Sequence, residues 1–244
     1  MRAAAAVIWT CVLGWWLLEV AGLSSVASQE WRTGGGVVLL REFFPRPTFE
    51  TVREECRRLR QRRLQKEHNS LAVGRRSRIV RPGEVLHETF MNDAIATRLS
   101  RITGRQLKVS AFPVELRHYE PGSFMPLHRD ESMFVEPQVE IVFTVINSSD
   151  SHTEWKLPSG ALVREWTEPN SMLVIEAEGA EHQVTRLQRG ERTIIKCVYT
   201  STDETTAAFD EILQGMSSSS GSPTGSKGRG GSRAKGRTKG KSRR

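Results

Sequence analysis

Cysteine is scarce in this sequence of 244 residues, which contains three. Cys11 lies in the N-terminal hydrophobic segment, so Cys56 and Cys197 are the two that a folded domain could use. Two cysteines can form one bridge, but they cannot form a disulfide framework or a cysteine-based zinc cluster. Cys56 falls in an expected helix and Cys197 in an expected strand, which favours two buried free thiols. No nucleophile or phosphate-binding motif supports a hydrolase or a transferase.

Acidic residues are missing from the C-terminal segment. Residues 216–244 contain nine lysines and arginines and no acid, whereas the whole chain has a formal net charge of +8. The chain before Met216 therefore has 27 basic and 28 acidic residues and is close to neutral. The excess of basic residues therefore lies in a C-terminal tail. The near-neutral remainder of the chain excludes a uniformly basic nucleic-acid-binding domain.

This tail, taken as residues 215–244, is rich in serine and glycine. It has almost no apolar groups, so we expect it to be disordered. It is either solvated without a partner or weakly attracted to a polyanion such as an acidic glycan, RNA or an anionic membrane face. We expect no specific nucleic-acid partner, because the N-terminus indicates entry into the secretory route.

Long hydrophobic runs are absent except at the N-terminus. Arg2 precedes a mostly apolar stretch over residues 3–18, and Val26 and Ser28 are acceptable small residues for cleavage after Ser28. The stretch is short for a spanning helix, which needs about 20 residues. We interpret residues 1–28 as a cleaved signal peptide, with an uncleaved anchor or another organelle's address as alternatives. The expected location is the secretory pathway, in the endoplasmic reticulum lumen or outside the cell. We expect membrane attachment only if the N-terminal segment is an uncleaved anchor.

Residues 29–106 are expected to form a helical support. We expect a short strand at 37–40, a helix from 47 to about 66 with Thr48 or Thr51 as N-cap, and a second helix from 91 to 102 that ends at Gly104. Arginines crowd the end of the first helix and the segment that follows. They form either a solvated helix face or a basic patch that faces the substrate. These arginines are Arg57, Arg58, Arg60, Arg62, Arg63, Arg75, Arg76, Arg78 and Arg81.

From residue 107 the sequence changes to short strands separated by proline and glycine turns. The expected strands are 107–112, 114–119, 140–146, 171–175, 181–187 and 193–199, and a final helix covers about 205–213. This pattern predicts a β-sandwich or barrel preceded by helices, and a jelly roll is the commonest such scaffold for a metal site. We therefore expect one catalytic core over residues 107–214.

His128 and Asp130 form an H-x-D pair at the end of a strand-like segment, 123–127. Alternation along a strand puts both side chains on one face, where an imidazole and a carboxylate can bind one ion. His182 begins a later strand, 54 residues after His128. Two histidines and a carboxylate on one face of an octahedron leave three positions open, which is the arrangement of non-haem Fe(II) oxygenases.

Arg192 and Tyr119 complete this constellation. Arg192 lies ten residues after His182, and we expect the turn at 189–190 to bring the strand that carries Arg192 back beside the one that carries His182. A guanidinium there can hold the far carboxylate of a dicarboxylic cosubstrate with two hydrogen bonds. Tyr119, nine residues before His128, places a phenol near the same pocket.

In order, these elements resemble the catalytic core of the prolyl 4-hydroxylase-like 2-oxoglutarate/Fe(II)-dependent dioxygenases. They are Tyr119-x-x-Gly122, His128-x-Asp130, His182-x-Val184 and Gly190-x-Arg192. The resemblance covers about residues 107–201. It implies an α+β, mainly β fold, a double-stranded β-helix (jelly roll) with supporting N-terminal helices.

The resemblance also implies a reaction and the residues that carry it. The reaction is hydroxylation of a protein or peptide side chain, with peptidyl proline as the leading candidate, coupled to decarboxylation of 2-oxoglutarate to succinate. Fe(II), 2-oxoglutarate and O₂ are the implied cofactors, and ascorbate is the expected reductant. The implied metal ligands are His128, Asp130 and His182. The implied cosubstrate-binding residues are Arg192 for the C5 carboxylate, Tyr119 and Thr144.

Two positions depart from the family pattern. The Gly-Gly-x-Thr stretch is represented by residues 151–155, and Cys197 and Val198 replace the tryptophan after the arginine. Both positions shape the substrate mouth, so the substrate stays open. The alternatives are an oxygenase for a small molecule or a nucleic acid, and a non-catalytic metal-binding jelly-roll module. Nucleic-acid demethylases of this superfamily space two arginines R-x-x-x-x-x-R, and here the sixth residue after Arg192 is Val198.

Overall fold

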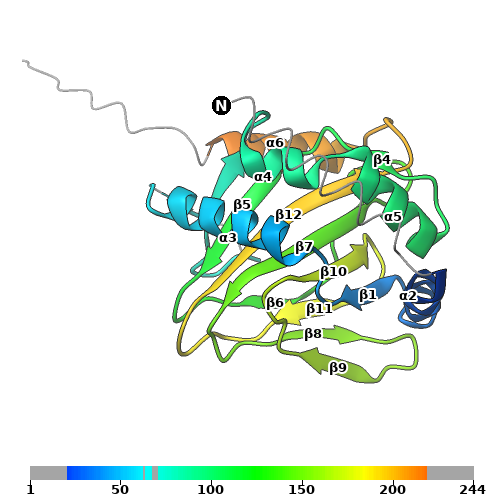
Figure 1. Ribbon diagram of the computed structural model, residues 1–244, viewed down its shortest axis with the longest axis horizontal. Helices are drawn as coiled ribbons and strands as arrows, with labels where there is room; N and C mark the ends of the chain where they lie inside the picture. Colours follow the sequence, from blue (N-terminus) through cyan, green and yellow to red (C-terminus); the bar gives the residue numbers. More distant parts are fainter. Residues whose placement is uncertain (1–20, 63, 68–70, 219–244) are drawn as a thin grey trace, which may run out of the picture.

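The fold is built on two antiparallel sheets, seen in a computed structural model that describes residues 21–62, 64–67 and 71–218 (Figure 1). The larger sheet has eight strands. Its path is β1 (Val37–Leu40), β10 (Ser171–Glu176), β7 (Val139–Asn147), β12 (Arg192–Thr200), β5 (Val114–Tyr119), β3 (Arg76–Val80) and β2 (Gln65–Lys66), with β4 (Lys108–Val109) paired to β12. Every one of these pairings is antiparallel.

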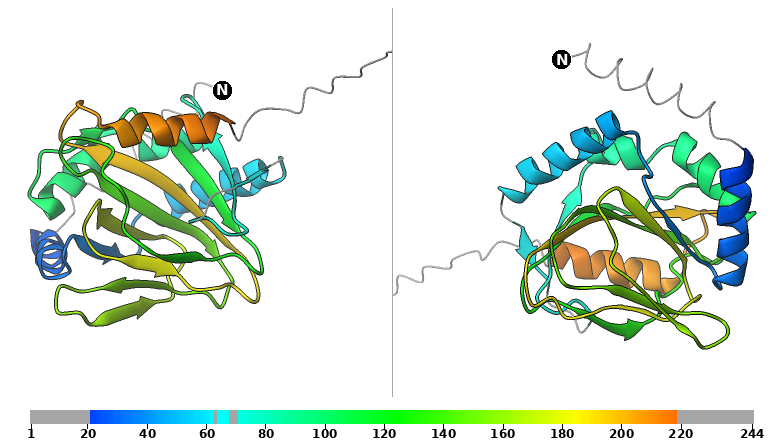
Figure 2. Two further views of the ribbon diagram at one scale, coloured as in Figure 1. Left: turned by 180° about the vertical axis from the view of Figure 1, so that it is seen from behind. Right: turned by 60° about the horizontal axis from the view of Figure 1, so that its bottom comes forward.

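The smaller sheet has four strands and lies against one face of the larger sheet, as the views in Figure 2 show. In order they are β6 (Met125–His128), β11 (His182–Val184), β8 (Thr153–Lys156) and β9 (Leu162–Glu165). Together the two sheets form a mainly β double-stranded β-helix with added helices. This arrangement confirms the fold class that the spacing of short strands predicts.

Helices α3 (Arg46–Arg60), α4 (Val85–Phe90) and α5 (Asp93–Thr103) cover the other face of the larger sheet (Figure 1). Helix α3 ends six residues earlier than predicted and begins after Pro45, so neither Thr48 nor Thr51 is its N-cap. Its buried residues recur at helical spacing, and they pack into the main hydrophobic core. They are Phe49, Val52, Cys56 and Leu59.

Helix α5 begins at an Asn92 cap whose side chain accepts a hydrogen bond from the Ile95 amide, and it ends at Gly104 as predicted. Gly104 has a φ of 73°, a conformation that glycine adopts without strain. Helix α6 (Ala207–Ser218) runs further than the predicted 205–213, so residues 215–218 of the predicted tail are helical. The remainder of that tail, 219–244, lies outside the described residues.

Helix α2 (Ala21–Thr33) was not anticipated from the sequence. Ala27 and Trp31 are buried in the same core as α3 and α5. The predicted cleavage position after Ser28 falls within this helix, and the hydrophobic segment before residue 21 lies outside the described residues. The signal peptide therefore stays a prediction. In the part of the chain that the structure covers, no helix has the length and hydrophobicity to span a membrane.

The strands of the larger sheet alternate between two environments. Along β12, Ile195, Cys197 and Tyr199 face the helices and join the main core. Arg192 and Lys196 alternate with them and face the space between the two sheets. Cys56 and Cys197 are buried free thiols, which confirms the prediction made for them, and burial raises the pKa of both.

Candidate metal and cosubstrate site

The three predicted metal ligands lie together between the sheets. His128 ends β6 and pairs in register with His182 on β11, and their ring centroids are 4.3 Å apart. The Asp130 carboxylate reaches both rings, with Oδ1 3.7 Å from His128 Nε2 and Oδ2 3.4 Å from His182 Nε2. One ligand atom from each residue lies within 4.8 Å of the others. Among residues 21–62, 64–67 and 71–218, this is the one such group of three.

Both histidines present a lone pair to this group. His128 Nδ1 lies 2.8 Å from the carbonyl of Pro126, and His182 Nδ1 lies 3.1 Å from the carbonyl of Ala180. A carbonyl can only accept, so each Nδ1 carries the proton and each Nε2 is unprotonated in the neutral ring. His128 Nε2 is buried and has no hydrogen-bond partner in the described part of the chain. A buried lone pair without a partner fits a metal ion.

The charges around the triad favour a cation at its centre. Burial would raise the pKa of Asp130, but Lys196, His128 and His182 hold it well below its ordinary range. Burial would lower the pKa of His182, but the Asp130 carboxylate raises it. The site therefore draws positive charge toward His182 Nε2, and a divalent cation bound there would replace a proton.

Arg192 begins β12 and is buried, and no carboxylate of the residues that the structure describes pairs with its charge. Its side chain is 1% exposed, and its Nε and Nη1 have no hydrogen-bond partner among the described residues. Burial lowers the pKa of Arg192, against a smaller raising effect from Tyr119. An uncompensated buried charge is costly, and a carboxylate bound between the sheets would pair with it.

The route from His182 to Arg192 differs from the prediction. We expected the two strands to lie side by side, but β11 pairs with β6 and β8 in the smaller sheet, whereas β12 joins the larger sheet. The connection crosses between the sheets and turns at Gly190, which has a φ of 74°. A Cβ at Gly190 would lie 2.2 Å from the Ser148 carbonyl oxygen, so a side chain does not fit there. His182 and Arg192 therefore lie on different sheets and face the same interior space from opposite sides.

Tyr119 lies opposite Arg192 in register, on the neighbouring strand β5. Its hydroxyl accepts a hydrogen bond of 3.1 Å from Arg75 Nη1 and donates one of 3.2 Å to Met125 Sδ. A thioether is a weak acceptor. The phenol can therefore turn its proton to a stronger acceptor that enters the same space.

Arg75 is a site residue that sequence reasoning misplaced in the basic patch. It is 3% exposed, lies beside Tyr119 and pairs with the Glu67 carboxylate through both Nε and Nη2. Arg117 and Arg75 together hold the pKa of Glu67 at about 2, although burial would raise it. The cue in the sequence was weak: Arg75 directly precedes a strand, β3, that alternation did not reveal.

Thr144 lies on β7 and is buried, as the resemblance implies for a residue near the cosubstrate. Its hydroxyl lies 3.0 Å from that of Thr167 and donates to it. Thr144 pairs in register with Ile194, two residues after Arg192. The structure thus places it close to Arg192 along the sheet, and its part in binding stays a prediction.

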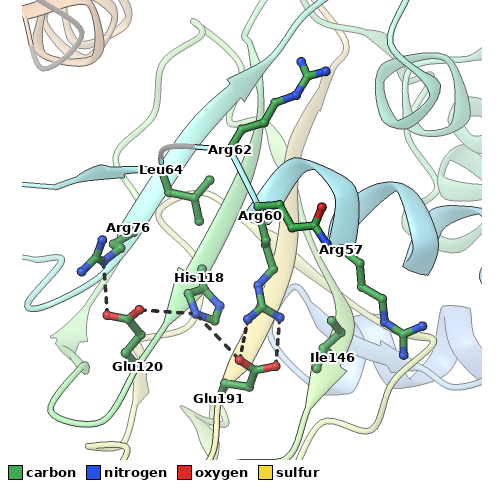
Figure 3. Close-up of a pocket in the computed structure, with 10 residues that line it drawn as sticks. Arg57, Arg60, Arg62, Leu64, Arg76, His118, Glu120, Ile146 and Glu191 are labelled. Atoms are coloured by element: carbon green, nitrogen blue, oxygen red, sulfur yellow. Dashed lines mark hydrogen bonds and ion pairs between the residues drawn. The ribbon is translucent and has the colours of Figure 1, made fainter. Parts of the chain in front are cut away.

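The arginines of the predicted basic patch are mostly paired with acids. A pocket of about 570 Å³ lies beside the end of α3, and Figure 3 shows Arg60 paired with Glu191 and Arg76 with Glu120 around it. Buried His118 forms its floor, with Nδ1 3.0 Å from the Thr193 hydroxyl. The further pairs are Arg58 with Glu55, Arg78 with Glu84 and Arg75 with Glu67.

This pairing favours the solvated helix face over a basic patch that faces the substrate. In Figure 3 Arg57 and Arg62 extend away from the two carboxylates. His118 alternates with Tyr119 along β5, so the pocket lies on the helix side of the sheet and not between the sheets. We therefore assign the chemistry to the triad and not to this pocket.

Comparisons with known proteins show the fold. No protein-family model matches the chain, and no curated protein matches its sequence. A prolyl-4-hydroxylase from Pseudomonas putida is similar in structure with a TM-score of 0.60 at 16% identity, over 73% of this chain and 99% of that one. A prolyl hydroxylase from Trichoplax adhaerens, solved with a hypoxia-inducible-factor peptide, has a TM-score of 0.64 at 14% identity, over 85% and 97%.

A third solved structure has a different activity. The non-haem α-ketoglutarate-dependent epimerase SnoN from nogalamycin biosynthesis has a TM-score of 0.63 at 12% identity, over 75% of this chain and 84% of that one. Two of these three proteins are prolyl hydroxylases and the third is an epimerase, so similarity to this fold does not determine one activity. The chain has the fold of the prolyl 4-hydroxylases and 2-oxoglutarate/Fe(II) oxygenases, together with the His–Asp–His triad that its sequence predicts.

Proposed function

We propose that this chain is a 2-oxoglutarate- and Fe(II)-dependent dioxygenase. One observation carries the proposal: two buried groups without hydrogen-bond partners in the described residues, His128 Nε2 and the Arg192 guanidinium, lie between the same two sheets. In the described part of the chain, His128 Nε2 has no hydrogen-bond partner, within a triad whose tautomers suit a metal. Arg192, on the same side of the larger sheet, forms no ion pair with a carboxylate of those residues. A metal ion and a dicarboxylate would satisfy both, so the residues present fit these two ligands.

Each residue then has a defined task. His128, Asp130 and His182 would hold Fe(II) and leave three positions open. Arg192 would hold the far carboxylate of 2-oxoglutarate with two charge-assisted hydrogen bonds, and Tyr119 would donate a third. Bound iron with 2-oxoglutarate and O₂ supplies oxidative decarboxylation to succinate and CO₂ and transfer of one oxygen atom to the substrate. Burial of Arg192 and Tyr119 would exclude water from a cosubstrate held there, which would strengthen these contacts.

For the substrate we propose a protein or peptide side chain, with peptidyl proline as the leading candidate. The proposal is supported by two prolyl hydroxylases among the similar structures, both at low sequence identity. SnoN, an epimerase with a comparable TM-score, makes a small-molecule substrate the alternative. Ascorbate is proposed as the reductant that keeps iron in the Fe(II) state.

Turnover of 2-oxoglutarate tests the reaction class. The purified full chain with Fe(II) and ascorbate should form succinate, and His128→Ala should abolish this because a ligand is lost. Glu165→Gln, a change on exposed strand β9, is the matched control and should turn over normally. No succinate from the unmodified chain, or equal rates in His128→Ala, would contradict the proposal.

Mass spectrometry tests the substrate class. Candidate secreted peptides incubated with the enzyme should gain about 16 Da, the mass of one oxygen atom, at proline. A mass gain on another residue would support a peptide substrate and contradict proline as the modified residue. Uncoupled turnover with no peptide modified, together with a modified small molecule, would favour the alternative.

We also propose that the chain acts in the secretory pathway, on the pattern of residues 1–28. A tagged chain should co-localise with markers of the endoplasmic reticulum or appear in the medium, and removal of residues 1–20 should redirect it to the cytosol. The same location after the truncation would contradict the proposal. The basic tail is proposed to contact a polyanion, and its attraction should weaken with added salt.

A further inference from the structure

Lys196 and Glu140 form a buried ion pair beside the metal triad. Lys196 lies on β12 four residues after Arg192, so both side chains face the space between the sheets. The ammonium lies 3.6 Å from Asp130 Oδ1 and pairs with the Glu140 carboxylate from β7. The Glu140 side chain is buried at 2% exposure, and the Lys196 side chain is 11% exposed. The three metal ligands are complete without this pair, so it has a role of its own.

Glu140 is held in place from behind. Gln138 Nε2 donates hydrogen bonds of 3.1 Å to Glu140 Oε1 and 2.9 Å to the Glu131 carbonyl. Gln138 Oε1 accepts from the Met133 amide at 2.9 Å. The glutamine is fully buried and is tied to the loop that follows Asp130. The Glu140 carboxylate is therefore a fixed anchor for the ammonium.

Such a group of buried charges is unfavourable for stability. Apolar residues of similar volume would do as well or better, because desolvation offsets the attraction between buried ions. The Lys196 ammonium lies between the carboxylates of Asp130 and Glu140, and both attract its positive charge. Its two carboxylate neighbours compete for it, and one of them is a metal ligand.

We propose that Lys196 and Glu140 set the affinity of the triad for its divalent cation, in opposite directions. Lys196 orients Asp130 and opposes a second positive charge at the same carboxylate. Glu140 restrains Lys196 and contributes negative charge, so it favours the cation. Both are positioning residues that act through Asp130, and the inference rests on the proposed function in that the triad binds a metal.

Metal binding without turnover tests the pair. Metal-free full chain is titrated with Mn(II), and free Mn(II) is followed by electron paramagnetic resonance. Lys196→Met should bind Mn(II) about tenfold more tightly, and Glu140→Gln about tenfold more weakly, because a unit charge is removed close to the metal. Glu84→Gln is the control, because it removes a carboxylate from a partly buried pair with Arg78 on the helix side of the sheet, and it should change the affinity by less than about twofold.

The outcomes separate the inference from the proposed function. Opposite shifts in the two variants support the inference. Shifts in the same direction, or no shift in either, would overturn it while leaving the oxygenase proposal intact. A wild-type chain that does not bind Mn(II) would overturn both.

A measurement on the wild-type chain covers the case in which a variant does not fold. Diamagnetic Zn(II) bound at the triad engages Asp130 and weakens its contact with Lys196. The ¹⁵N resonance of the Lys196 ammonium should therefore move on addition of Zn(II). A resonance that stays in place while Zn(II) binds would overturn the inference.

Discussion

Along β12, the residues that face the helices and those that face the smaller sheet differ in almost every physical property. Ile195, Cys197 and Tyr199 are part of an apolar core beneath α3, α4 and α5. Arg192, which is buried, and Lys196, whose side chain is 11% exposed, alternate with them and place their charges between the sheets. One face of β12 thus packs into the apolar core, and the other face of the same strand carries the charged residues of the candidate site.

The difference shows where stability comes from. On the helix side, four phenylalanine rings pack edge to face or tilted at centroid distances of 4.8 to 6.3 Å. These rings are Phe43, Phe44, Phe90 and Phe143. Burial of such rings is among the largest favourable terms in folding. Between the sheets, buried ions cost desolvation, and under the proposed function they serve to bind a metal ion and a dicarboxylate.

The largest expected effect on stability is on the helix side. Phe143→Ala removes a fully buried ring and should lower the free energy of unfolding by about 3–5 kcal/mol. Thr144→Val, the next residue on the opposite face, removes a hydroxyl bonded to Thr167 and should cost about 1 kcal/mol. Denaturant unfolding measures both. A larger loss at Thr144 than at Phe143 would break the comparison.

Arg192→Met should reduce turnover strongly without lowering the free energy of unfolding. The efficiency of 2-oxoglutarate turnover should fall about 10²- to 10³-fold, because a buried carboxylate loses its charged partner. The free energy of unfolding should stay equal or rise, because an unpaired buried charge is removed. Arg105→Met, which breaks a pair with Glu176 near the surface, is the matched control and should leave turnover unchanged. A less stable Arg192→Met with normal turnover would contradict the assignment.

The Glu67–Arg75 pair predicts a pH dependence. The pKa of Glu67 is about 2 in the folded chain, below an ordinary value of about 4.3, so its contribution to stability is full above the ordinary value and is lost as pH falls toward 2. In Glu67→Gln, stability should drop less steeply between about pH 4.5 and 2, by an amount on the order of 2 kcal/mol. Unfolding at a series of pH values measures this, and an unchanged slope would remove Glu67 from the buried network.

The two tyrosines of the sequence give the smallest and most direct test, because one lies on each face. Tyr119→Phe should raise the KM for 2-oxoglutarate about fivefold, through loss of one hydrogen bond, with little change in stability. Tyr199 donates to the Phe90 carbonyl on the helix side. Tyr199→Phe should lower the free energy of unfolding by about 1 kcal/mol and leave KM unchanged. A raised KM in Tyr199→Phe together with a stability loss in Tyr119→Phe would contradict the assignment of the two faces.

Much of the β core was predictable from the sequence, because its strands are long and rich in β-branched residues. The strand at 114–119 has its predicted bounds, and β7, β10 and β12 extend the predicted strands by one residue at one or both ends. The triad was predictable for a similar reason. His128 ends one strand, Asp130 follows it, and His182 begins a later strand, at a spacing that few other chemistries require.

Other elements could not be predicted from local patterns. Strands β8 and β9 are four residues each, and β3 is rich in arginine, so their alternation is hidden. The path from His182 to Arg192 depends on which sheet β12 joins, and a turn motif does not determine that. Arg75 carries the charge of a surface residue, and its burial follows from Glu67 and Tyr119, which tertiary contacts bring to it.

The alternation of charge along β12 also limits how the sheet can assemble. A slip of one residue against β5 or β7 would turn Lys196 toward the phenylalanine core and Cys197 toward Asp130. The ammonium would then be buried without a carboxylate, which costs several kcal/mol. An apolar strand would pair almost equally well in neighbouring registers, whereas this one excludes them. The polar face therefore contributes to folding specificity while it lowers folding stability.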